Sequence, residues 1–538
     1  MLDTILTRPA VLAPALIIIG YLLYHLVFKP SIKLPSEFPI IGAKDGDWFP
    51  ILQAKWRNTT NFKATLHLAE TQFRNQPVIL PLLGVPNLIL LPRSDIDFVQ
   101  QQDRSVLDLR TETDFRLQLN YTSPNPDLMN LHEHIVQNKW LTDTLTSQVG
   151  ALIPAILEET AYTLDKHWGT PTDWTSVGVY QTTAQMLALV SNRAFVGTPT
   201  NRIPKLTQVG MKYAVDLPLK SAIIRCLWTP ISPLVAYLLT IPVRRYAREF
   251  EKILEPEITR RIALYDAKHN TPHDPENKTS TFSPEPNDAI QWILNSAKAT
   301  NNPLMWKPST IADRILILNF ASIHTSDYAL TQTIIELAWS KQEYLSQLRA
   351  EIETCLAETN NQWTKRAVAK MVKLDSSLRE SSRLNSFQPA GLGRVVMSPH
   401  GVKTPSSGEV IIPQGASVVV PAYNAHRDPT VYPDPETFHP FRFVDQGSSE
   451  KGVKSASSSY VNTGCDYLAF GSGKYACTGR FFAAVELKVM LAYIILNYDI
   501  DVQEGCRRPE SRWVVWNVIM PLDATIRVRK RVVGGKAG

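Results

Sequence analysis

Apolar stripes at helical spacing alternate with short apolar runs along most of the chain. From about residue 130 to 270 the stripes are long, which predicts a mostly helical stretch. Residues 309–339 are apolar on nearly all sides and predict the longest helix, one that runs through a core. Two short apolar runs between Val78 and Leu91, on either side of Gly84, predict a β-hairpin. The pattern therefore predicts a mostly α fold with a small β portion.

Polar residues predict where two of these helices begin. Ser309 follows Pro308 and is placed to cap the long helix. Ser94 or Asp95 is placed to cap a helix that begins at Ile96. In each case a side-chain oxygen would accept a hydrogen bond from a free N–H group in the first helical turn.

The N-terminal segment is the most apolar part of the chain. Residues 10–28 contain no Asp, Glu, Lys or Arg, and a helix of roughly 20 apolar residues spans the hydrocarbon core of a bilayer. No small-residue cleavage site follows, so a removed signal peptide is the weaker interpretation. We expect residues 1–28 to form a membrane anchor, residues 29–45 a Pro-rich hinge and residues 46–538 one large domain.

Charges beside this segment predict its orientation. Lys29 and Lys33 follow the apolar span, and Arg8 precedes it. An excess of cations marks the cytoplasmic side of a membrane helix. The body of the protein is therefore expected to face the cytosol. Three N-glycosylation sequons, which this orientation leaves unused, begin at Asn58, Asn120 and Asn277.

Composition narrows the possible function classes. The formal net charge is +6 and no block rich in Lys and Arg occurs, which argues against a nucleic-acid-binding protein. The five cysteines form no C-x-x-C pair, as expected in a reducing compartment. A polar, Pro-containing stretch at 270–288 predicts an exposed linker within the large domain. A Ser- and Lys-rich stretch at 447–460 predicts a disordered insertion.

One Gly-rich stretch carries the main candidate chemistry. Phe470 begins a loop with Gly471 and Gly473 that leads through Cys477 and Gly479 into a run with helical spacing. N–H groups at the start of a helix favour the thiolate form of a nearby cysteine. A thiolate is the axial ligand of haem iron where the chemistry is cleavage of an O–O bond.

Two other interpretations of this loop are open. It can be an ordinary buried cysteine beside a glycine turn. It also fits the dinucleotide fingerprint Gly471-x-Gly473-x-x-Ala476, with Asp499 as the acidic residue that follows. The second interpretation is weak, because too few residues follow Asp499 to build the rest of a dinucleotide-binding domain.

The same loop resembles the haem-binding loop of the cytochrome P450 superfamily, the haem-thiolate monooxygenases. The family pattern is Phe, two residues, Gly, one residue, Arg or His, one residue, Cys, one residue, Gly. Phe470, Gly473, Cys477 and Gly479 stand in their places, and Tyr475 occupies the basic position. The resemblance implies haem b as the cofactor, with Cys477 as the ligand of its iron.

Contacts to the haem propionates are assigned by this resemblance as well. In the family the basic residue of the loop holds a propionate. Here the Tyr475 hydroxyl group or the ammonium group of Lys474 is expected to replace it. Arg394, at the end of a predicted turn and strand, is a further candidate. The family's Trp-x-x-x-Arg contact does not carry over, because Trp140 is followed by Thr144 at that spacing.

The middle of the long helix, residues 321–326, resembles the family's oxygen-activation motif. Small side chains at Ala321 and Ser322 allow close approach of a planar cofactor. The Thr325 hydroxyl group is placed to bond back to the Ala321 carbonyl, four residues earlier. His324 stands where the family has an acid, as in a fungal secondary-metabolism branch. The resemblance implies that Thr325 and His324 deliver protons.

A third motif resembles the family's Glu-x-x-Arg pair. Glu380 and Arg383 share one face of a predicted helix, and alone this spacing is usually a surface salt bridge of little value. In the family the pair is buried and is joined by an arginine from a Pro-rich stretch. Arg442 matches that arginine, and its planar guanidinium suits a carboxylate better than a lysine would.

These resemblances cover roughly residues 30 to 530 and imply a cytochrome P450 fold with residues 46–538 as the catalytic domain. They imply dioxygen as co-substrate and electrons from NADPH through NADPH-cytochrome P450 reductase. They also imply a single-pass protein of the endoplasmic reticulum membrane. The expected reaction is hydroxylation or multistep oxidation of an apolar secondary metabolite, most resembling the terpenoid or indole-terpenoid substrates of fungal relatives.

Two other functions are open at this point. A haem-thiolate enzyme can desaturate or rearrange its substrate without net insertion of oxygen. A membrane-bound haem protein can also act as a sensor without catalysis. A product without oxygen from labelled dioxygen would indicate the desaturating or rearranging enzyme. A protein that does not consume NADPH would indicate the sensor.

Overall fold

The computed structural model describes residue 20 and residues 32–125, 128, 136, 140–227, 231–270, 285–445 and 458–531. Apart from Gly20, the expected membrane anchor lies outside the described residues, and so do most of the two polar stretches at 270–288 and 447–460. In the part of the chain that is described, no helix is both long enough and apolar enough to cross a bilayer.

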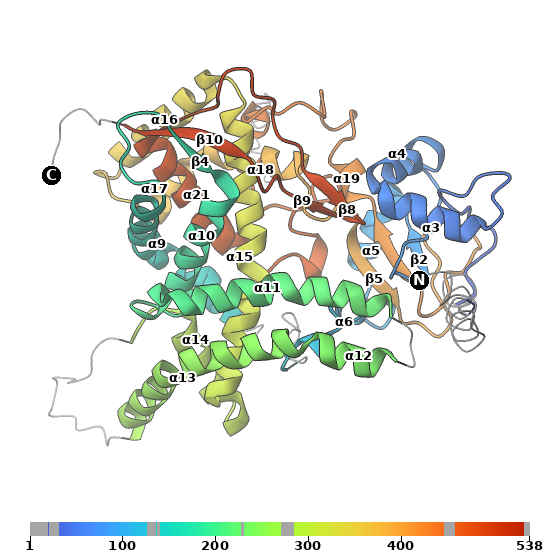
Figure 1. Ribbon diagram of the computed structural model, residues 1–538, viewed down its shortest axis with the longest axis horizontal. Helices are drawn as coiled ribbons and strands as arrows, with labels where there is room; N and C mark the ends of the chain where they lie inside the picture. The colour runs from blue at the N-terminus through green and yellow to red at the C-terminus, as the bar shows by residue number, and fades with distance from the viewer. Residues whose placement is uncertain are drawn as a thin grey trace, which may run out of the picture.

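Helices make up most of the described chain (Figure 1). Their bounds are α3 Pro50–Thr60, α4 Phe62–Gln72, α5 Ile96–Gln101, α6 Leu109–Leu117, α7 Leu119–Thr122, α9 Thr146–His167, α10 Val179–Phe195, α11 Pro204–Arg225, α12 Ser232–Leu239, α13 Ile241–Asn270, α14 Ala289–Lys298, α15 Pro308–Ala338, α16 Gln342–Ala357, α17 Lys365–Lys370, α18 Val372–Leu384, α19 Ala422–Ala425, α20 Arg442–Asp445 and α21 Arg480–Asn497. The strands are β1 Val78–Ile79, β2 Leu88–Leu90, β3 Leu107–Asp108, β4 Thr175–Gly178, β5 Gly391–Val396, β6 Ser417–Val420, β7 Tyr498–Asp501, β8 Arg512–Val514, β9 Asn517–Ile519 and β10 Thr525–Lys530. The mostly α fold with a small β portion is thereby confirmed.

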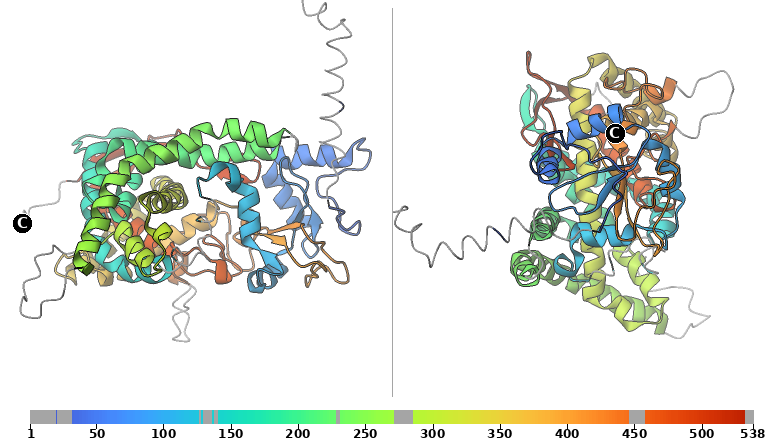
Figure 2. Two further views of the ribbon diagram at one scale, coloured as in Figure 1. Left: turned by 90° about the horizontal axis from the view of Figure 1, so that it is seen from below. Right: turned by 90° about the vertical axis from the view of Figure 1, so that its right-hand side faces the viewer.

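Helix α15 runs through the middle of the molecule (Figure 1), and the left view of Figure 2 looks along it with other helices around it. Its bounds lie within one residue of the predicted 309–339. Helices α10, α11, α13 and α18 pack against it. Each fully buried Leu or Ile side chain of such a helix stabilises the fold by about 1.5–3 kcal/mol. The helix therefore fixes residues 321–326 at the centre of the helical part of the fold.

The strands form three small sheets. A five-stranded sheet has the order β1-β2-β6-β5-β3, a second has the order β4-β10-β7, and β8 pairs with β9. Val78 pairs with Leu90 in the antiparallel β1–β2 ladder, so the predicted hairpin is confirmed. The five-stranded sheet lies beside α3 and α4 (Figure 1) and carries Arg394 on β5.

Strand β5 contains a bulge that affects the candidate site. Its register with β6 shifts between Gly391 and Arg394, and Leu392 within the shift has a φ of 50°. A leucine in the left-handed region is strained and persists only where its surroundings impose that conformation. A bulge also changes the direction of the residues that follow it. Here the residue redirected in this way is Arg394.

The predicted cap of α15 is wrong, and that of α5 is confirmed in position but not in its hydrogen bond. Lys307 is the N-cap of α15, and Ser309 lies within the helix. Asp95 precedes α5 but makes no capping hydrogen bond. Its carboxylate accepts hydrogen bonds from the backbone N–H and the hydroxyl group of Ser406 instead. A partner distant in the sequence therefore displaces the local contact that the sequence favours.

One of the three sequons is blocked by its own burial. The Asn58 amide donates to the carbonyls of Ile41 at 3.0 Å and Pro81 at 3.1 Å, and the residue is buried. A glycan has no room at this nitrogen. Asn120 is exposed, and Asn277 lies outside the described residues.

Candidate active site

The loop before α21 is a tight turn closed by its own backbone. The Cys477 N–H group donates to the Phe470 carbonyl at 2.8 Å. Between them, Gly473 has a φ of 67°, and a Cβ atom there would come within 2.9 Å of the Gln100 carbonyl oxygen. Both facts require glycine at position 473. The close approach to Gln100 fixes the loop against α5.

Cys477 is exposed, whereas the preceding Ala476 is buried. Burial of the surrounding loop raises the pKa of the Cys477 thiol above its ordinary value. The backbone N–H groups of Gly479 and Arg480, and the Arg480 guanidinium, act in the opposite direction. The loop thus packs around the Cys477 side chain on one side, and the side chain remains exposed on the other, where an iron ion can bind. The loop alone favours the neutral thiol, and a coordinating iron favours the thiolate.

Thr325 is the exposed residue in the middle of the central helix α15. Its neighbours Ile323 and Ser326 are buried, and Ala321 is half-buried. The Thr325 hydroxyl group donates to the Ala321 carbonyl at 2.9 Å, as the motif predicts. An exposed threonine on a helix that runs through the interior marks a surface that a bound molecule can cover.

His324 faces different surroundings from its neighbour Thr325. Burial lowers the pKa of its imidazole below the ordinary value, and the Met211 backbone carbonyl on α11 acts in the opposite direction. Its Nε2 atom is buried and has no hydrogen-bond partner among the described residues. The ring is therefore neutral near pH 7 and lies against the helix that crosses α15.

The structure brings together all three residues of the expected Glu-Arg-Arg lock. Arg383 donates from Nε and Nη2 to the two oxygens of Glu380 at 2.8 and 2.9 Å. Arg442 donates from Nε to Glu380 at 3.0 Å. The side chains of Glu380 and Arg383 are fully buried. Arg383 also donates to the carbonyls of His426 and Pro435, so one guanidinium joins α18 to two later segments of the chain.

Of the three propionate candidates, Arg394 and Lys474 differ sharply in their surroundings. Lys474 forms an ion pair with Asp103 at 2.5 Å. Arg394 is buried, and its Nη1 atom donates a hydrogen bond to the Gly393 carbonyl at 2.8 Å. Burial lowers the pKa of Arg394 to about 10. Its Nε atom has no hydrogen-bond partner among the described residues. Arg394, rather than Lys474, can therefore donate a further hydrogen bond to an anion.

The Tyr475 ring lies beside Arg394. The guanidinium carbon is 5.0 Å from the ring centroid, within the range of a cation–π interaction. Sequence reasoning named both residues but did not bring them together, because the contact joins strand β5 to a loop that is distant in sequence.

His426 is a supporting residue that sequence reasoning missed. Its Nε2 atom accepts a hydrogen bond from the Leu468 N–H at 2.7 Å, and its Nδ1 lies 2.8 Å from the Ser386 hydroxyl oxygen. Burial lowers its pKa to about 3, so the ring is neutral. His426 thereby links the end of α18 to the segment that leads into the Cys477 loop. A lone histidine beside an Arg-Asp pair gave no signal of this role.

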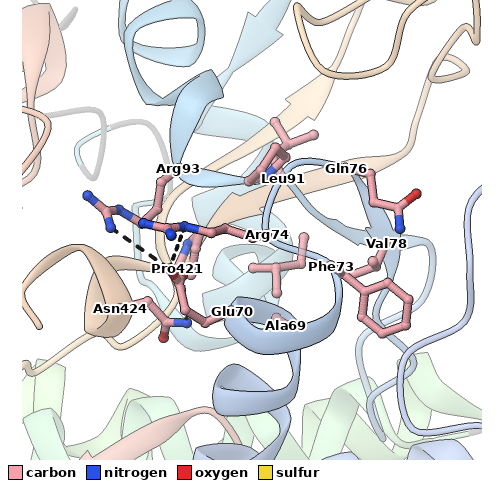
Figure 3. Close-up of a pocket in the computed structure, with 12 residues that line it drawn as sticks. Ala69, Glu70, Phe73, Arg74, Gln76, Val78, Leu91, Arg93, Pro421 and Asn424 are labelled. Carbon is pink, nitrogen blue, oxygen red and sulfur yellow. Dashed lines mark hydrogen bonds and ion pairs between the residues drawn. The ribbon is translucent and has the colours of Figure 1, made fainter. Parts of the chain in front are cut away.

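A hollow in the surface lies elsewhere, between α4, the end of β2 and α19 (Figure 3). Its empty volume is about 250 Å³. Among its lining residues, Glu70 pairs with Arg74 at 3.2 Å and with Arg93 at 4.0 Å. None of the candidate site residues lines it. Its charges are paired with one another, so we do not place the reaction there.

Comparison with known proteins agrees with this geometry. The model of the family described as Cytochrome P450 matches residues 116–522, more than half of the chain. The chain belongs to the cytochrome P450 family. The matched residues include α15, the lock and the Cys477 loop.

Several curated relatives of this P450 are similar along most of its length. Cytochrome P450 monooxygenase gloP of Glarea lozoyensis is 31% identical over 85% of this chain and 84% of its own length. Cytochrome P450 monooxygenase 110 of Postia placenta is 33% identical, over 77% of this chain and 78% of its own. Cytochrome P450 monooxygenase pbrC of Penicillium brasilianum is 27% identical over 97% of this chain and 96% of its own. This P450 is a monooxygenase.

Family membership implies a haem-thiolate iron, dioxygen, an electron donor and an apolar substrate, and the residues present fit a haem. Cys477 offers an open sulfur at the end of a loop closed by its own backbone. Arg394 is a buried cation with an unpartnered nitrogen, which suits a carboxylate of the cofactor.

Proposed function

We propose that this P450 hydroxylates, or oxidises in several steps, an apolar secondary metabolite of the terpenoid or indole-terpenoid class. The observation that carries the proposal is the pair of exposed side chains in interior elements, Cys477 on the loop and Thr325 on the central helix. The half-buried Phe320 and Ala321 on the same helix support an apolar substrate. The relatives named as monooxygenases support the reaction class.

Each candidate residue has a role in this proposal. Haem b, when bound, supplies the iron that activates dioxygen. Cys477 holds that iron through its thiolate, and Arg394 holds a propionate. Thr325 and His324 form the proton-delivery pair, in which the Thr325 hydroxyl group orients a proton donor at the haem face of α15.

The remaining residues of the site position these groups. Glu380, Arg383 and Arg442 hold α18 and the segment around residue 435 in place behind the loop. Gly473 and Gly479 let the loop approach a flat cofactor closely. Phe470 packs its ring against Tyr460 at a centroid distance of 5.0 Å.

We further propose that electrons come from NADPH through NADPH-cytochrome P450 reductase and that the protein is held in the endoplasmic reticulum membrane by residues 1–28. The apolar segment 10–28, followed by Lys29 and Lys33, supports an anchor with a cytosolic body. In this arrangement the catalytic domain meets apolar substrates at the membrane surface.

The test is an incubation with reductase, NADPH, isotopically labelled dioxygen and a panel of terpenoids. We expect a product that carries one or more labelled oxygen atoms. A product without label assigns desaturation or rearrangement instead. Substrate binding without NADPH consumption over the whole panel assigns a sensor.

A further inference from the structure

The Tyr475 ring lies close to two cationic side chains. The Arg394 guanidinium carbon is 5.0 Å from its centroid, and the Lys474 ammonium nitrogen is 5.3 Å from it. The face of an aromatic ring attracts a cation within about 6 Å of the centroid, and the attraction is stronger where water is excluded. The ring therefore stabilises positive charge on both residues.

The two cations depend on the ring to different degrees. Lys474 is half exposed and has a carboxylate partner in Asp103. Arg394 is buried and forms no ion pair among the described residues, and the nearby carboxylates of Glu112 and Asp108 act on it only at longer range. It donates one hydrogen bond to the Gly393 carbonyl and packs against the Tyr475 ring.

An arginine in the place of Tyr475, as the family pattern has it, would add a third cation beside these two. Like charges at such distances repel, and the repulsion is strongest where the groups are shielded from water. A neutral ring avoids this cost and leaves Arg394 free to take an anion. The departure from the family pattern at position 475 is thus matched to the buried arginine on β5.

We propose that Tyr475 is a positioning residue whose ring, rather than its hydroxyl group, holds the Arg394 guanidinium in the orientation that binds a haem propionate. This inference rests on the proposed function, in which Arg394 is the propionate contact. The bulge at Leu392 directs Arg394 from the sheet side, and the ring supports it from the loop side.

The experiment measures the rate of haem loss from the loaded, full-length protein to excess apomyoglobin, together with the midpoint potential of the iron. The variants are Tyr475→Phe, Tyr475→Leu, Arg394→Gln and the double variant Tyr475→Leu with Arg394→Gln. Lys474→Gln is the matched control, because it removes the other cation that contacts the same ring.

Tyr475→Phe and Lys474→Gln should lose haem at the parent rate. Tyr475→Leu should lose it about tenfold faster, the effect of a desolvated cation–π contact. Arg394→Gln should lose it at least as fast, and the double variant no faster than Arg394→Gln alone, because the ring acts through the arginine. Tyr475→Leu and Arg394→Gln should both lower the midpoint potential of the iron. The first displaces a positive charge near the haem, and the second removes it.

Four results would overturn the inference. If Tyr475→Phe loses haem as fast as Tyr475→Leu, the Tyr475 hydroxyl group is a direct propionate contact. Additive effects in the double variant would show that Tyr475 acts independently of Arg394. A Tyr475→Leu variant that keeps the parent rate, while Arg394→Gln loses haem quickly, would remove the inference and leave the proposed role of Arg394 intact. An Arg394→Gln variant at the parent rate would remove both.

Discussion

Thr325 and His324 are adjacent in the sequence but have different physical states. Thr325 is exposed, and its hydroxyl group is held by the Ala321 carbonyl in a fixed direction. His324 is neutral near pH 7, because burial lowers the pKa of its imidazole. A held hydroxyl group can orient a proton donor, and a neutral imidazole can pass a proton only by accepting one first.

Thr325→Ala should therefore keep haem and substrate binding but lower the yield of product per NADPH roughly tenfold or more. The lost electrons should appear as hydrogen peroxide, measured beside NADPH consumption and product. Thr333→Ala is the matched control, because the Thr333 hydroxyl group makes the same bond to a carbonyl four residues earlier on the same helix. An equal yield of product per NADPH in the two variants would contradict the role of Thr325 in proton delivery.

His324→Ala should shift electrons to hydrogen peroxide in the same direction as Thr325→Ala. The measurement includes haem content and melting temperature, because His324 also lies against the Met211 carbonyl of α11. Loss of haem or stability with unchanged coupling would assign His324 to holding α15 against α11.

Glu486 is a buried carboxyl group that ties stability to pH. Its Oε1 accepts a hydrogen bond from the Ser191 hydroxyl group at 2.7 Å, and burial raises its pKa to about 8. The folded protein keeps this group protonated, whereas the unfolded chain releases the proton above its ordinary pKa of 4.5. The contribution of Glu486 to the free energy of unfolding is therefore full below about pH 4.5 and decreases as the pH rises towards 8.

Glu486→Gln should flatten that slope, because an amide keeps the hydrogen bond and does not titrate. The check is the melting temperature of the haem-loaded protein between pH 5 and pH 8, with the exposed Glu510→Gln as control. An unchanged slope in Glu486→Gln would show that its carboxyl group does not set this dependence.

At the scale of elements, the lock joins three parts of the chain through one buried carboxylate. Arg383 on α18 and Arg442 at the start of α20 both donate to Glu380. Arg383 also reaches the carbonyls of His426 and Pro435. Removing one partner leaves a buried charge that is poorly paired, which costs about 3–5 kcal/mol.

Arg383→Lys should give little haem-loaded protein, although it keeps the charge. A lysine ammonium group cannot replace a two-pronged contact with Glu380 and two carbonyl contacts together. Haem content per mass of purified protein is the measurement. Arg508→Lys is the control, because Arg508 makes a two-pronged contact with Glu336 at a partly exposed site. Near-normal haem content in Arg383→Lys would show that the pair of Glu380 and Arg383 is not needed for the fold.

The elements also show what the sequence can and cannot predict. The bounds of α15 were predictable within one residue, because apolar residues on all sides leave no alternative to a buried helix. The bond from Thr325 to Ala321 was predictable because it is local. The bonds from Ser406 to Asp95, the link through His426 and the contact of Arg394 with Tyr475 were not. Each depends on a partner brought in by the fold from a distant part of the chain.

At the scale of the whole molecule, we propose that residues 1–28 anchor a catalytic domain in the membrane. Helix α15 runs through the middle of the described chain (Figure 1). Deletion of residues 1–28 should release the protein from sedimented membranes without loss of haem, because none of the candidate site residues lies in that segment. The exposed Asn120 should carry no glycan, as expected for a cytosolic body. Sedimentation that does not change, or a glycosidase-sensitive mass shift at Asn120, would contradict this placement.

The central claim is that Cys477 is the thiolate ligand of a haem iron, and the spectrum of the reduced carbon monoxide complex tests it most directly. The parent should show the strongly red-shifted Soret band of thiolate-ligated haem. Cys477→Ser should lose that band, while a control variant of another exposed cysteine, Cys506→Ser, should keep it. A Cys477→Ser variant with the red-shifted band intact would contradict the account.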